Sequence, residues 1–272
     1  MANPCIGAHS LLDTHTVTTT PSADASFPKT NLYDDRSYDL FKPTSSGTTV
    51  DIVTDAGVGL TADVDYLAIL NHDLLSPAGS GAACTWTFAH SADNVSYTTI
   101  ATATPTVSTV IFRKFAATYT NRYFRLRITR GAAFICAIGE LQWGVAVQFP
   151  YGLEFPYDPG ASRIEGQLNR SQTGKIIGAI RTHEFKEHKL NFPLVLYSWA
   201  YGTTVGQFGE FWTNHARLLK PFIYSWNPGD PGSYEADAYW AIFKPTDRLG
   251  RPLVTPLATG YVDIEFTVEG EA

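Results

Sequence analysis

The segment from Arg122 to Ile128 constrains the fold of this chain more than any other. It reads Arg122-Tyr123-Phe124-Arg125-Leu126-Arg127-Ile128, and basic or polar residues alternate with apolar ones. Successive side chains of a β-strand point to opposite faces, so the alternation predicts a strand with one buried and one exposed face. A sheet with one apolar face buries it against a second layer. The segment therefore favours a layered β fold.

Short segments rich in Val, Ile, Thr and aromatic residues lie on both sides of this strand and are bounded by turn residues. Seven strands at this spacing indicate a β-sandwich or jelly roll. We expect the strands at 49–55, 64–71, 83–90, 95–102, 109–115, 121–129 and 135–143.

Prolines and glycines interrupt this rhythm between residues 145 and 172. The 272 residues suffice for two domains of ordinary size. The first 25 residues carry much Thr, Ser, Ala and Pro with little periodicity, which is typical of an extended arm. We therefore predict an arm at 1–25, a sandwich at 26–146 and a second domain at 147–272.

The second domain is also expected to be rich in β-strands, with one α-helix at 204–219. Apolar residues in this helix fall three and four positions apart, Thr203 or Thr204 can cap its start, and Pro221 ends it. The predicted strands are 174–181, 183–190, 221–226, 236–243 and 260–268. The fold class is thus mainly β: a jelly-roll sandwich followed by a β-rich domain with one helix.

Composition and charge exclude several classes of function. Hydrophobic residues make up 44% of the chain and charged residues 17%, which predicts a folded protein. The formal charge of −6 disfavours nucleic acid as a partner, because phosphate binding needs clustered Lys and Arg. No apolar run approaches the length of a membrane span. The first residues lack the basic start and apolar run of a signal peptide, so we expect synthesis and folding in the cytoplasm.

No set of residues predicts catalysis or a cofactor. The segment His183-Glu184-Phe185-Lys186-Glu187-His188 is similar to a zinc-protease motif, but that motif places its histidines four apart on a helix. Here they are five apart in a predicted strand, where they point to opposite faces. Glu154, Asp158 and Glu165 could form a carboxylate pair, but they lie in the predicted linker. We therefore expect a non-enzymatic protein without a cofactor.

The first half resembles the discoidin, or galactose-binding-like, family over roughly residues 20–144. Three segments carry the resemblance in the family's order. They are the entry loop Ser26-Phe27-Pro28-Lys29-Thr30-Asn31-Leu32-Tyr33-Asp34-Asp35, the strand Tyr66-Leu67-Ala68-Ile69-Leu70-Asn71-His72 and the turn segment Phe88-Ala89-His90-Ser91-Ala92-Asp93-Asn94-Val95-Ser96-Tyr97-Thr98.

This resemblance implies two sites. Family members bind glycans or lipid headgroups through loops at one end of the sandwich, which implies ligand binding by Asn71, His72 and Asp73. Some hold calcium near the entry loop, which implies Asn31 together with residues 34–35, Asp34 and Asp35, as a calcium site. Both sets have a structural alternative, because Asn, Asp and His at strand ends also form turns. No other metal site is expected.

The second half resembles tail-tip and baseplate proteins of tailed bacteriophages. The resemblance rests on a Pro- and Gly-rich opening, the turn Leu168-Asn169-Arg170-Ser171, paired strands, a helix with Phe211-Trp212, and the segment Pro221-Phe222-Ile223-Tyr224-Ser225-Trp226-Asn227-Pro228. It implies a virion structural protein of the distal tail, a minor tail protein made in the host bacterial cytoplasm. The implied partners are further copies in a ring, the tail tube, hub and tape-measure proteins, and possible host-surface glycans.

Aromatic residues crowd the second half, and aromatics dominate interfaces as well as cores. We therefore expect Arg170, Phe208, Phe211 and Trp212 to face neighbouring subunits. The alternative is a monomeric core rich in aromatics. A competing hypothesis for function is a carbohydrate-binding protein that acts through loops 71–82 and 91–98. A third, a hydrolase with an appended binding module, lacks a catalytic set.

Overall fold

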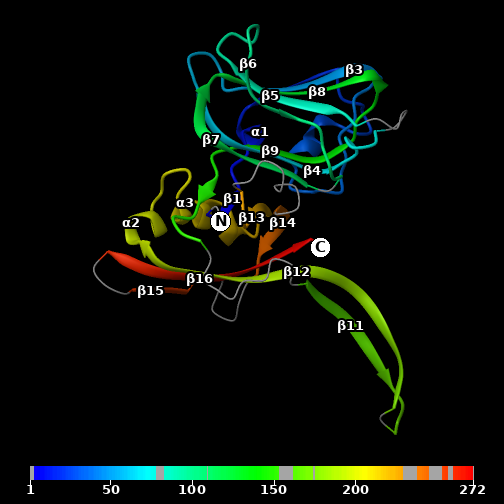
Figure 1. Ribbon diagram of the computed structural model, residues 1–272, viewed down its shortest axis with the longest axis vertical. Coiled ribbons are helices and arrows are strands. Elements are labelled where there is room, and N and C mark those ends of the chain that lie inside the picture. The colour runs from blue at the N-terminus through cyan, green and yellow to red at the C-terminus, as the bar shows by residue number, and fades with distance from the viewer. Residues whose placement is uncertain are drawn as a thin grey trace. The chain divides into compact units, whose positions relative to one another are not determined.

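The computed structural model describes residues 3–77, 83–108, 110–152, 162–173, 175–228, 238–244, 253–256 and 260–271. The chain forms two compact units, Met1–Gln148 with Ile223–Ala238, and Phe149–Phe222 with Tyr239–Ala272. Strands dominate both units (Figure 1), which confirms the prediction of a mainly β fold. Within the described ranges, no helix has the length and apolar character needed to cross a bilayer.

The first unit is an antiparallel β-sandwich. One sheet has five strands in the order β2-β3-β8-β5-β6, and the other has three in the order β7-β4-β9. The strands are β2 (Thr16–Thr20), β3 (Gly47–Asp55), β4 (Ala62–His72), β5 (Thr85–Ser91), β6 (Thr98–Ala103), β7 (Val110–Asn121), β8 (Tyr123–Phe134) and β9 (Ile138–Gly144). The seven predicted strands correspond to β3 through β9, with ends shifted by a few residues.

The alternation that predicts β8 also builds the core. Phe124, Leu126 and Ile128 are fully buried, whereas the residues between them are partly exposed. These three side chains belong to one cluster with the buried Trp86 of β5 and Trp143 of β9. Burial of one such side chain stabilises the fold by about 2 to 3 kcal/mol. The Trp143 indole also donates a hydrogen bond to the Thr54 hydroxyl at 3.1 Å, so its polar atom is satisfied inside the core.

The first 25 residues are not the extended arm that their composition predicts. They contain β1 (Cys5–Gly7), α1 (Leu11–Thr14) and β2. Strand β2 pairs along its whole length with β3, and its single buried side chain is Val17. A threonine-rich strand with one buried residue shows little hydrophobic periodicity, which explains why the sequence pattern misses it.

A late segment of the chain joins the first unit, which differs from the predicted single boundary near residue 146. Strand β1 pairs on one side with β10 (Val147–Gln148) and on the other with β13 (Phe222–Ser225). All three residues of β1 are buried, so both neighbours are needed to satisfy its backbone. Such pairing over more than 200 residues leaves no local signal in the sequence.

The second unit is a sheet in the order β14-β16-β12-β11, with β15 also paired to β16. Its elements are β11 (Ser162–Arg170), β12 (Ile176–Leu196), α2 (Tyr197–Ala200), α3 (Phe208–Asn214), β14 (Ala238–Phe243), β15 (Leu253–Pro256) and β16 (Tyr261–Glu271); η1 (Lys29–Leu32) and η2 (Ala216–Leu218) are 3₁₀ turns of the chain. The two strands predicted at 174–181 and 183–190 are one continuous strand, β12. Strand β11 lies in the stretch predicted to be irregular.

The predicted helix at 204–219 is shorter in the structure. Helix α3 covers only Phe208–Asn214, because Gly206 has a positive φ of 89° before it and Leu219 adopts a left-handed conformation after η2. The residue that precedes α3 is Gln207 rather than a threonine cap, and its Oε1 accepts a hydrogen bond from the Thr204 amide at 3.1 Å. The helical periodicity therefore identifies the position of the helix but overestimates its length.

Gly139 offers a test of the packing between β9 and the loop before β3. A Cβ atom at this position would overlap the carbonyl oxygen of Ser37, a backbone atom that cannot rotate away. We expect Gly139→Ala to lower the free energy of unfolding by about 2 to 3 kcal/mol, measured by urea denaturation. The matched control is Gly131→Ala in β8, where a Cβ has open space. Equal stability of both variants would contradict this packing.

Candidate functional site

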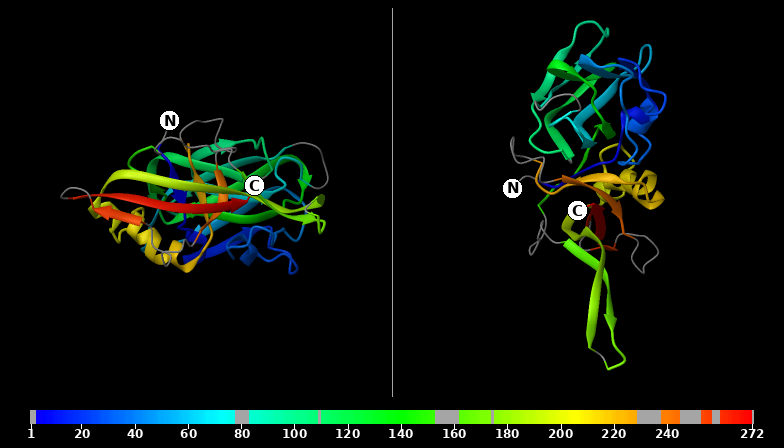
Figure 2. Two further views of the ribbon diagram at one scale, coloured as in Figure 1. Left: turned by 90° about the horizontal axis from the view of Figure 1, so that it is seen from below. Right: turned by 90° about the vertical axis from the view of Figure 1, so that its right-hand side faces the viewer.

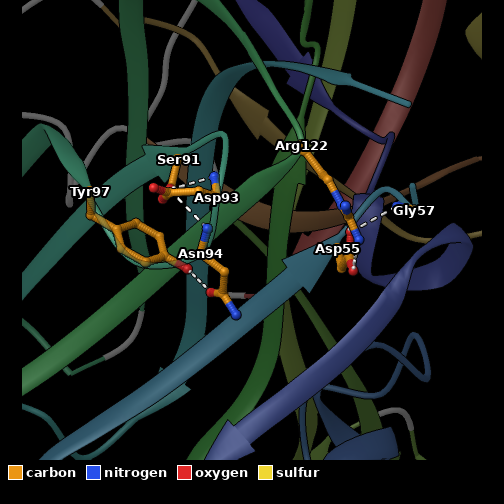
Figure 3. Close-up of polar contacts among 7 residues, drawn as sticks. All are labelled: Asp55, Gly57, Ser91, Asp93, Asn94, Tyr97 and Arg122. Carbon is orange, nitrogen blue, oxygen red and sulfur yellow. Dashed lines mark hydrogen bonds and ion pairs between the residues drawn. The ribbon is translucent and has the colours of Figure 1, made fainter. Parts of the chain in front are cut away.

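The turn after β5 holds a cluster of polar side chains that hydrogen bonds join to one another (Figure 3). Asp93 Oδ1 accepts hydrogen bonds from the Ser91 hydroxyl and the Ser96 amide, both at 2.9 Å. The backbone amide of Ser96 is the leading cause of the lowered pKa of Asp93. Asn94 has a φ of 61°, and its Oδ1 accepts the hydroxyl hydrogen bond of Tyr97. The turn thus holds Tyr97 in place before any ligand binds.

An ion pair fastens the neighbouring strand ends. Arg122 contacts Asp55 through two hydrogen bonds of 2.6 and 2.9 Å, and the same carboxylate accepts from the Gly57 amide (Figure 3). The hydrogen bond from Arg122 is the main cause of the lowered pKa of Asp55. Ser91 and Asp55 both lie opposite Tyr123 in the sheet, so the turn and the ion pair share one end of it.

Two further arginines, Arg125 and Arg127, lie along β8 on the outer face of the five-stranded sheet. Arg127 forms two hydrogen bonds of 2.7 Å with Asp51 across the β8–β3 pair. Arg125, two residues earlier on the same face, instead lies 3.7 Å from the centre of the Tyr97 ring. Its Nε atom is buried and has no hydrogen-bond partner among the described residues. Two basic side chains in the same row therefore have different environments.

The residues predicted as a ligand site, Asn71, His72 and Asp73, have structural contacts. Asn71 donates to the Ser37 carbonyl at 2.7 Å, and Asp73 accepts from the Ala137 amide at 2.8 Å. His72 is 4% exposed, and burial lowers its pKa to about 4. Its Nδ1 atom accepts from the Leu74 amide. The three residues thus form a turn, and residues 78–82 of the predicted binding loop 71–82 lie outside the described residues.

Arg130 is a buried polar residue that the sequence analysis misses. It and Asp73 both act electrostatically on Cys84, so it lies at the end of the sandwich that holds Asn71 and Asp73. It is 8% exposed, and none of its three guanidinium nitrogens has a hydrogen-bond partner within the described ranges. It is on the same face of β8 as Leu126 and Ile128, so it points toward the interior. Continuing the strand alternation by one step from Ile128 would have identified an arginine at an apolar position.

The predicted calcium residues do not form a complete ligand set. Asn31 donates to the Leu40 carbonyl, Asp34 accepts from the Arg36 amide, and Asp35 has a φ of 63°. Across the described ranges, His, Cys, Asp and Glu side chains nowhere gather in a group of three or more suited to a metal ion.

Glu140 of β9 is a buried acidic residue that the sequence analysis misses. It is 1% exposed, and its Oε2 atom has no hydrogen-bond partner among the described residues. Burial, followed by the nearby charges of Asp35, Asp13 and Asp34, raises its pKa to about 10. Glu140 and these aspartates do not form a metal-binding group within the described ranges, so a calcium titration is the test of the site that the resemblance implies.

The motifs set aside as catalytic remain separate in the structure. His183 is exposed and lies 3.3 Å from Glu165 on β11, whereas His188 is buried beside the Tyr239 ring. The two histidines thus lie on opposite faces of β12. Glu154 and Asp158 lie outside the described residues.

Two of the four predicted interface residues belong to the core of the second unit. Phe208 and Phe211 are 2% and 1% exposed, so they cannot face a neighbouring subunit. Phe208 packs against Phe149 and Phe266. This corrects the prediction and supports the alternative of an aromatic-rich core. Trp212 is partly buried against Phe243, and Arg170 is exposed at the end of β11.

Strands β11 and β12 form a ribbon that extends beyond the other strands of their unit (Figure 2). Strand β16 pairs with β12 from Phe185 onward, whereas Ile176 to Glu184 pair with β11 alone. Three isoleucines of the ribbon are exposed: Ile164 by 58%, Ile177 by 71% and Ile180 by 59%. We call residues 162–184 the ribbon.

An apolar surface lies at the other end of β12. A hollow of about 410 Å³ is lined there by Tyr151, Pro193, Leu194 and Tyr261. Leu196, in register with Tyr261, is also exposed. We call these five residues the apolar patch. Ribbon and patch are thus two different apolar surfaces on a single unit.

Comparisons with known proteins found solved structures that are similar to about half of this chain. No protein-family model matches the chain, and no curated protein matches it. Similar solved structures include chitosan-binding module 1 of a chitosanase/glucanase from Paenibacillus sp. IK-5, at 21% identity and a TM-score of 0.40, covering 50% of this chain and 98% of that one. Another is CpGH89CBM32-5 from Clostridium perfringens, at 11% identity and a TM-score of 0.40, covering 49% and 96%. A third is a putative alpha-L-fucosidase from Bacteroides thetaiotaomicron, at 20% identity and a TM-score of 0.41, covering 52% and 29%.

Glu140 makes stability depend on pH in a direction that can be measured. The folded state keeps this proton up to a pH of about 10, whereas the unfolded chain releases it near 4.5. The unfolded state therefore binds fewer protons between these values, and stability falls as the pH rises. Glu140→Gln removes the effect. Without divalent ions, we expect the variant to gain about 3 kcal/mol over the original chain at pH 7 and little at pH 4, measured by urea denaturation.

Calcium should reverse the sign of this substitution if it binds at Glu140. An ionised carboxylate holds the cation and the amide does not, so with millimolar calcium at pH 7 the original chain should become the more stable one. The same denaturation series in chelator and in calcium separates the two cases. Identical curves in both would exclude calcium at this site.

Proposed function

We propose that this chain is a non-enzymatic structural protein of a phage tail tip or baseplate that assembles with further copies of itself. The observation that supports the proposal most directly is the ribbon. A two-stranded hairpin is at best marginally stable in water, because it lacks an apolar face covered by another layer. Its exposed isoleucines and unpaired strand edge match a role in contact with another subunit.

The charge of the ribbon favours a second copy of the same chain as its partner. The ribbon, residues 162–184, holds four Lys and Arg and two Asp and Glu, a net charge of +2, whereas the whole chain carries −6. The remainder of the chain is therefore strongly acidic. A basic extension on an acidic body is complementary to the next copy of that body.

The ribbon and the apolar patch favour a head-to-tail arrangement. They are different surfaces, and an interface between two different surfaces repeats from subunit to subunit until a ring closes or a filament grows. We infer that the ribbon isoleucines of one copy pack on the apolar patch of the next. Arg170, at the end of β11, would lie in this interface.

A closed ring is compatible with a location in the tail of a virion. The subunits would be made in the host bacterial cytoplasm and assemble there. Tube, hub and tape-measure proteins are the further partners that this placement implies. The sandwich would then brace neighbouring proteins or contact a host-surface glycan.

Substitution of the ribbon isoleucines tests self-assembly. Ile177→Lys with Ile180→Lys changes two exposed side chains, so each copy should fold normally. We expect the oligomer of the original chain to be replaced by monomers in size-exclusion chromatography with light scattering. Val95→Lys, at an 81% exposed position in the sandwich, is the matched control and should still assemble. The assembly proposal fails if the original chain is monomeric at high concentration, or if the ribbon variant assembles equally well.

A second candidate function is carbohydrate binding by the sandwich, and Arg130 favours it. A buried guanidinium without hydrogen bonds is costly, and a ligand that accepts those bonds would offset the cost. It lies at the end of the sandwich that includes Asn71 and Asp73, where the resemblance places a glycan.

A glycan array tests this second function. We expect binding that Arg130→Lys reduces at least tenfold, since a lysine cannot reproduce the guanidinium fork. Arg36→Lys, at an exposed site in the same unit, should bind as the original chain does. Thermal denaturation of Arg130→Lys must first show a folded sandwich. Absence of binding by the folded original chain would remove this candidate.

A further inference from the structure

Three arginines lie on or directly before β8 of the five-stranded sheet, Arg122, Arg125 and Arg127, and two of them are neutralised. Arg122 and Arg127 each form two hydrogen bonds with one carboxylate, Asp55 and Asp51 respectively. Such paired contacts use the fork of the guanidinium fully and leave little capacity for another anion. Arg125 lies between these two arginines in the sequence, two residues before Arg127 on β8.

Arg125 has no carboxylate partner of its own. The residues opposite it are Val53 on β3 and Ala89 on β5, neither of which has a polar side chain. Tyr97 covers one face of the guanidinium at 3.7 Å, which leaves the edge that carries the N–H donors uncovered by the ring. No hydrogen bond joins Arg125 to any other residue in the described part of the chain, and its Nε atom is buried.

We propose that Arg125 and Tyr97 form a binding site for the carboxylate of an acidic sugar. The proposal is independent of self-assembly, and the site differs from the loop end near Arg130. Arginine binds a planar carboxylate through two parallel hydrogen bonds. Burial, followed by the charge of Arg127, lowers the pKa of Arg125, so the folded protein already holds this cation in an unfavourable environment. A carboxylate would offset both effects.

Hydroxyl groups beside Arg125 favour a sugar over a simple anion. Thr87 lies two residues before Ala89 on β5, on the same face of the sheet, and about 7 Å from Arg125 by strand geometry. Its hydroxyl forms a 3.0 Å hydrogen bond with the Thr102 hydroxyl of the neighbouring strand. Hydroxyls can donate or accept, so this pair can bind ring hydroxyls of a sugar whose carboxylate contacts Arg125.

The position of Tyr97 is fixed, which makes the site preorganised. Its hydroxyl is held by Asn94, and Asn94 in turn is part of the turn organised by Asp93 and Ser91 (Figure 3). A ligand therefore need not order the aromatic ring on binding. Preorganisation of this kind increases affinity without adding contacts.

Titration with galacturonic acid, followed by NMR at the Arg125 Nε–Hε signal, tests the site. We expect this signal to shift with galacturonic acid, to shift at least tenfold more weakly with acetate, and to remain unchanged with galactose. Equal binding of acetate would overturn the assignment of a sugar ligand. No shift with galacturonic acid would overturn the site itself.

Two variants and one control separate binding from a purely structural role. Arg125→Gln should weaken galacturonic acid binding at least tenfold, and Arg125→Lys, which keeps the charge but loses the fork, at least fivefold; signals of backbone amides around Tyr97 report binding in these variants. Arg36→Gln removes the same charge from an exposed ion pair and should have no effect. If Arg125→Gln unfolds, the lysine variant decides the question. Undiminished binding by a folded Arg125 variant contradicts the proposal.

Discussion

The pairing of β8 between β3 and β5 is the constraint on which the sandwich depends. This central strand places Phe124, Leu126 and Ile128 in the core and the intervening residues on the outer face. A shift of its register by one residue would exchange these faces and expose the core. The buried face therefore fixes the register, and the register in turn fixes which arginines meet a carboxylate. Core packing and surface chemistry are thus set by the same pairing.

The outer face shows how this register distributes charge. Asp51 lies across from Arg127, and Asp55 lies across from Tyr123, next to Arg122; each arginine forms a short ion pair with its aspartate at a partly exposed site. Such pairs add little to stability when solvent screens them. Their larger effect is to leave one arginine distinct from its neighbours. Arg125 differs because Val53 and Ala89 lie beside it, and this difference follows from the strand order rather than from any local motif.

Sequence patterns identified the sandwich better than the second unit for a physical reason. Strands with one buried face alternate, as β3 and β8 do, so periodicity could locate them. Strands β4 and β9 are buried on both faces, so each forms a short, mostly apolar run that also indicates a strand. The ribbon buries no face, and β11 therefore lacks the signal. Edge strand β2 and the three-residue β1 depend on pairing with distant segments, which single-sequence patterns do not contain. The apolar period extends beyond both ends of α3. The helix starts only after Gly206, whose positive φ is a backbone feature that the period does not reveal.

The candidate site residues also divide into those that a local sequence signal identifies and those that only the structure reveals. The sequence identified the turn at 91–98 because Ser, Asp and Asn have strong turn preferences, and it identified Asn71 and Asp73, whose role in the structure is to fix a turn. It did not identify Arg125, Arg130 or Glu140, because each is defined by what lies opposite it. Phe208 and Phe211 illustrate the converse error, since aromatic enrichment alone does not distinguish a core from an interface. Burial decides between the two for Phe208 and Phe211, which belong to the core, whereas Tyr151 and Tyr261 of the apolar patch stay exposed. The proposed assembly is therefore expected to depend on the ribbon isoleucines, the apolar patch and charge complementarity, and not on the aromatic residues of α3.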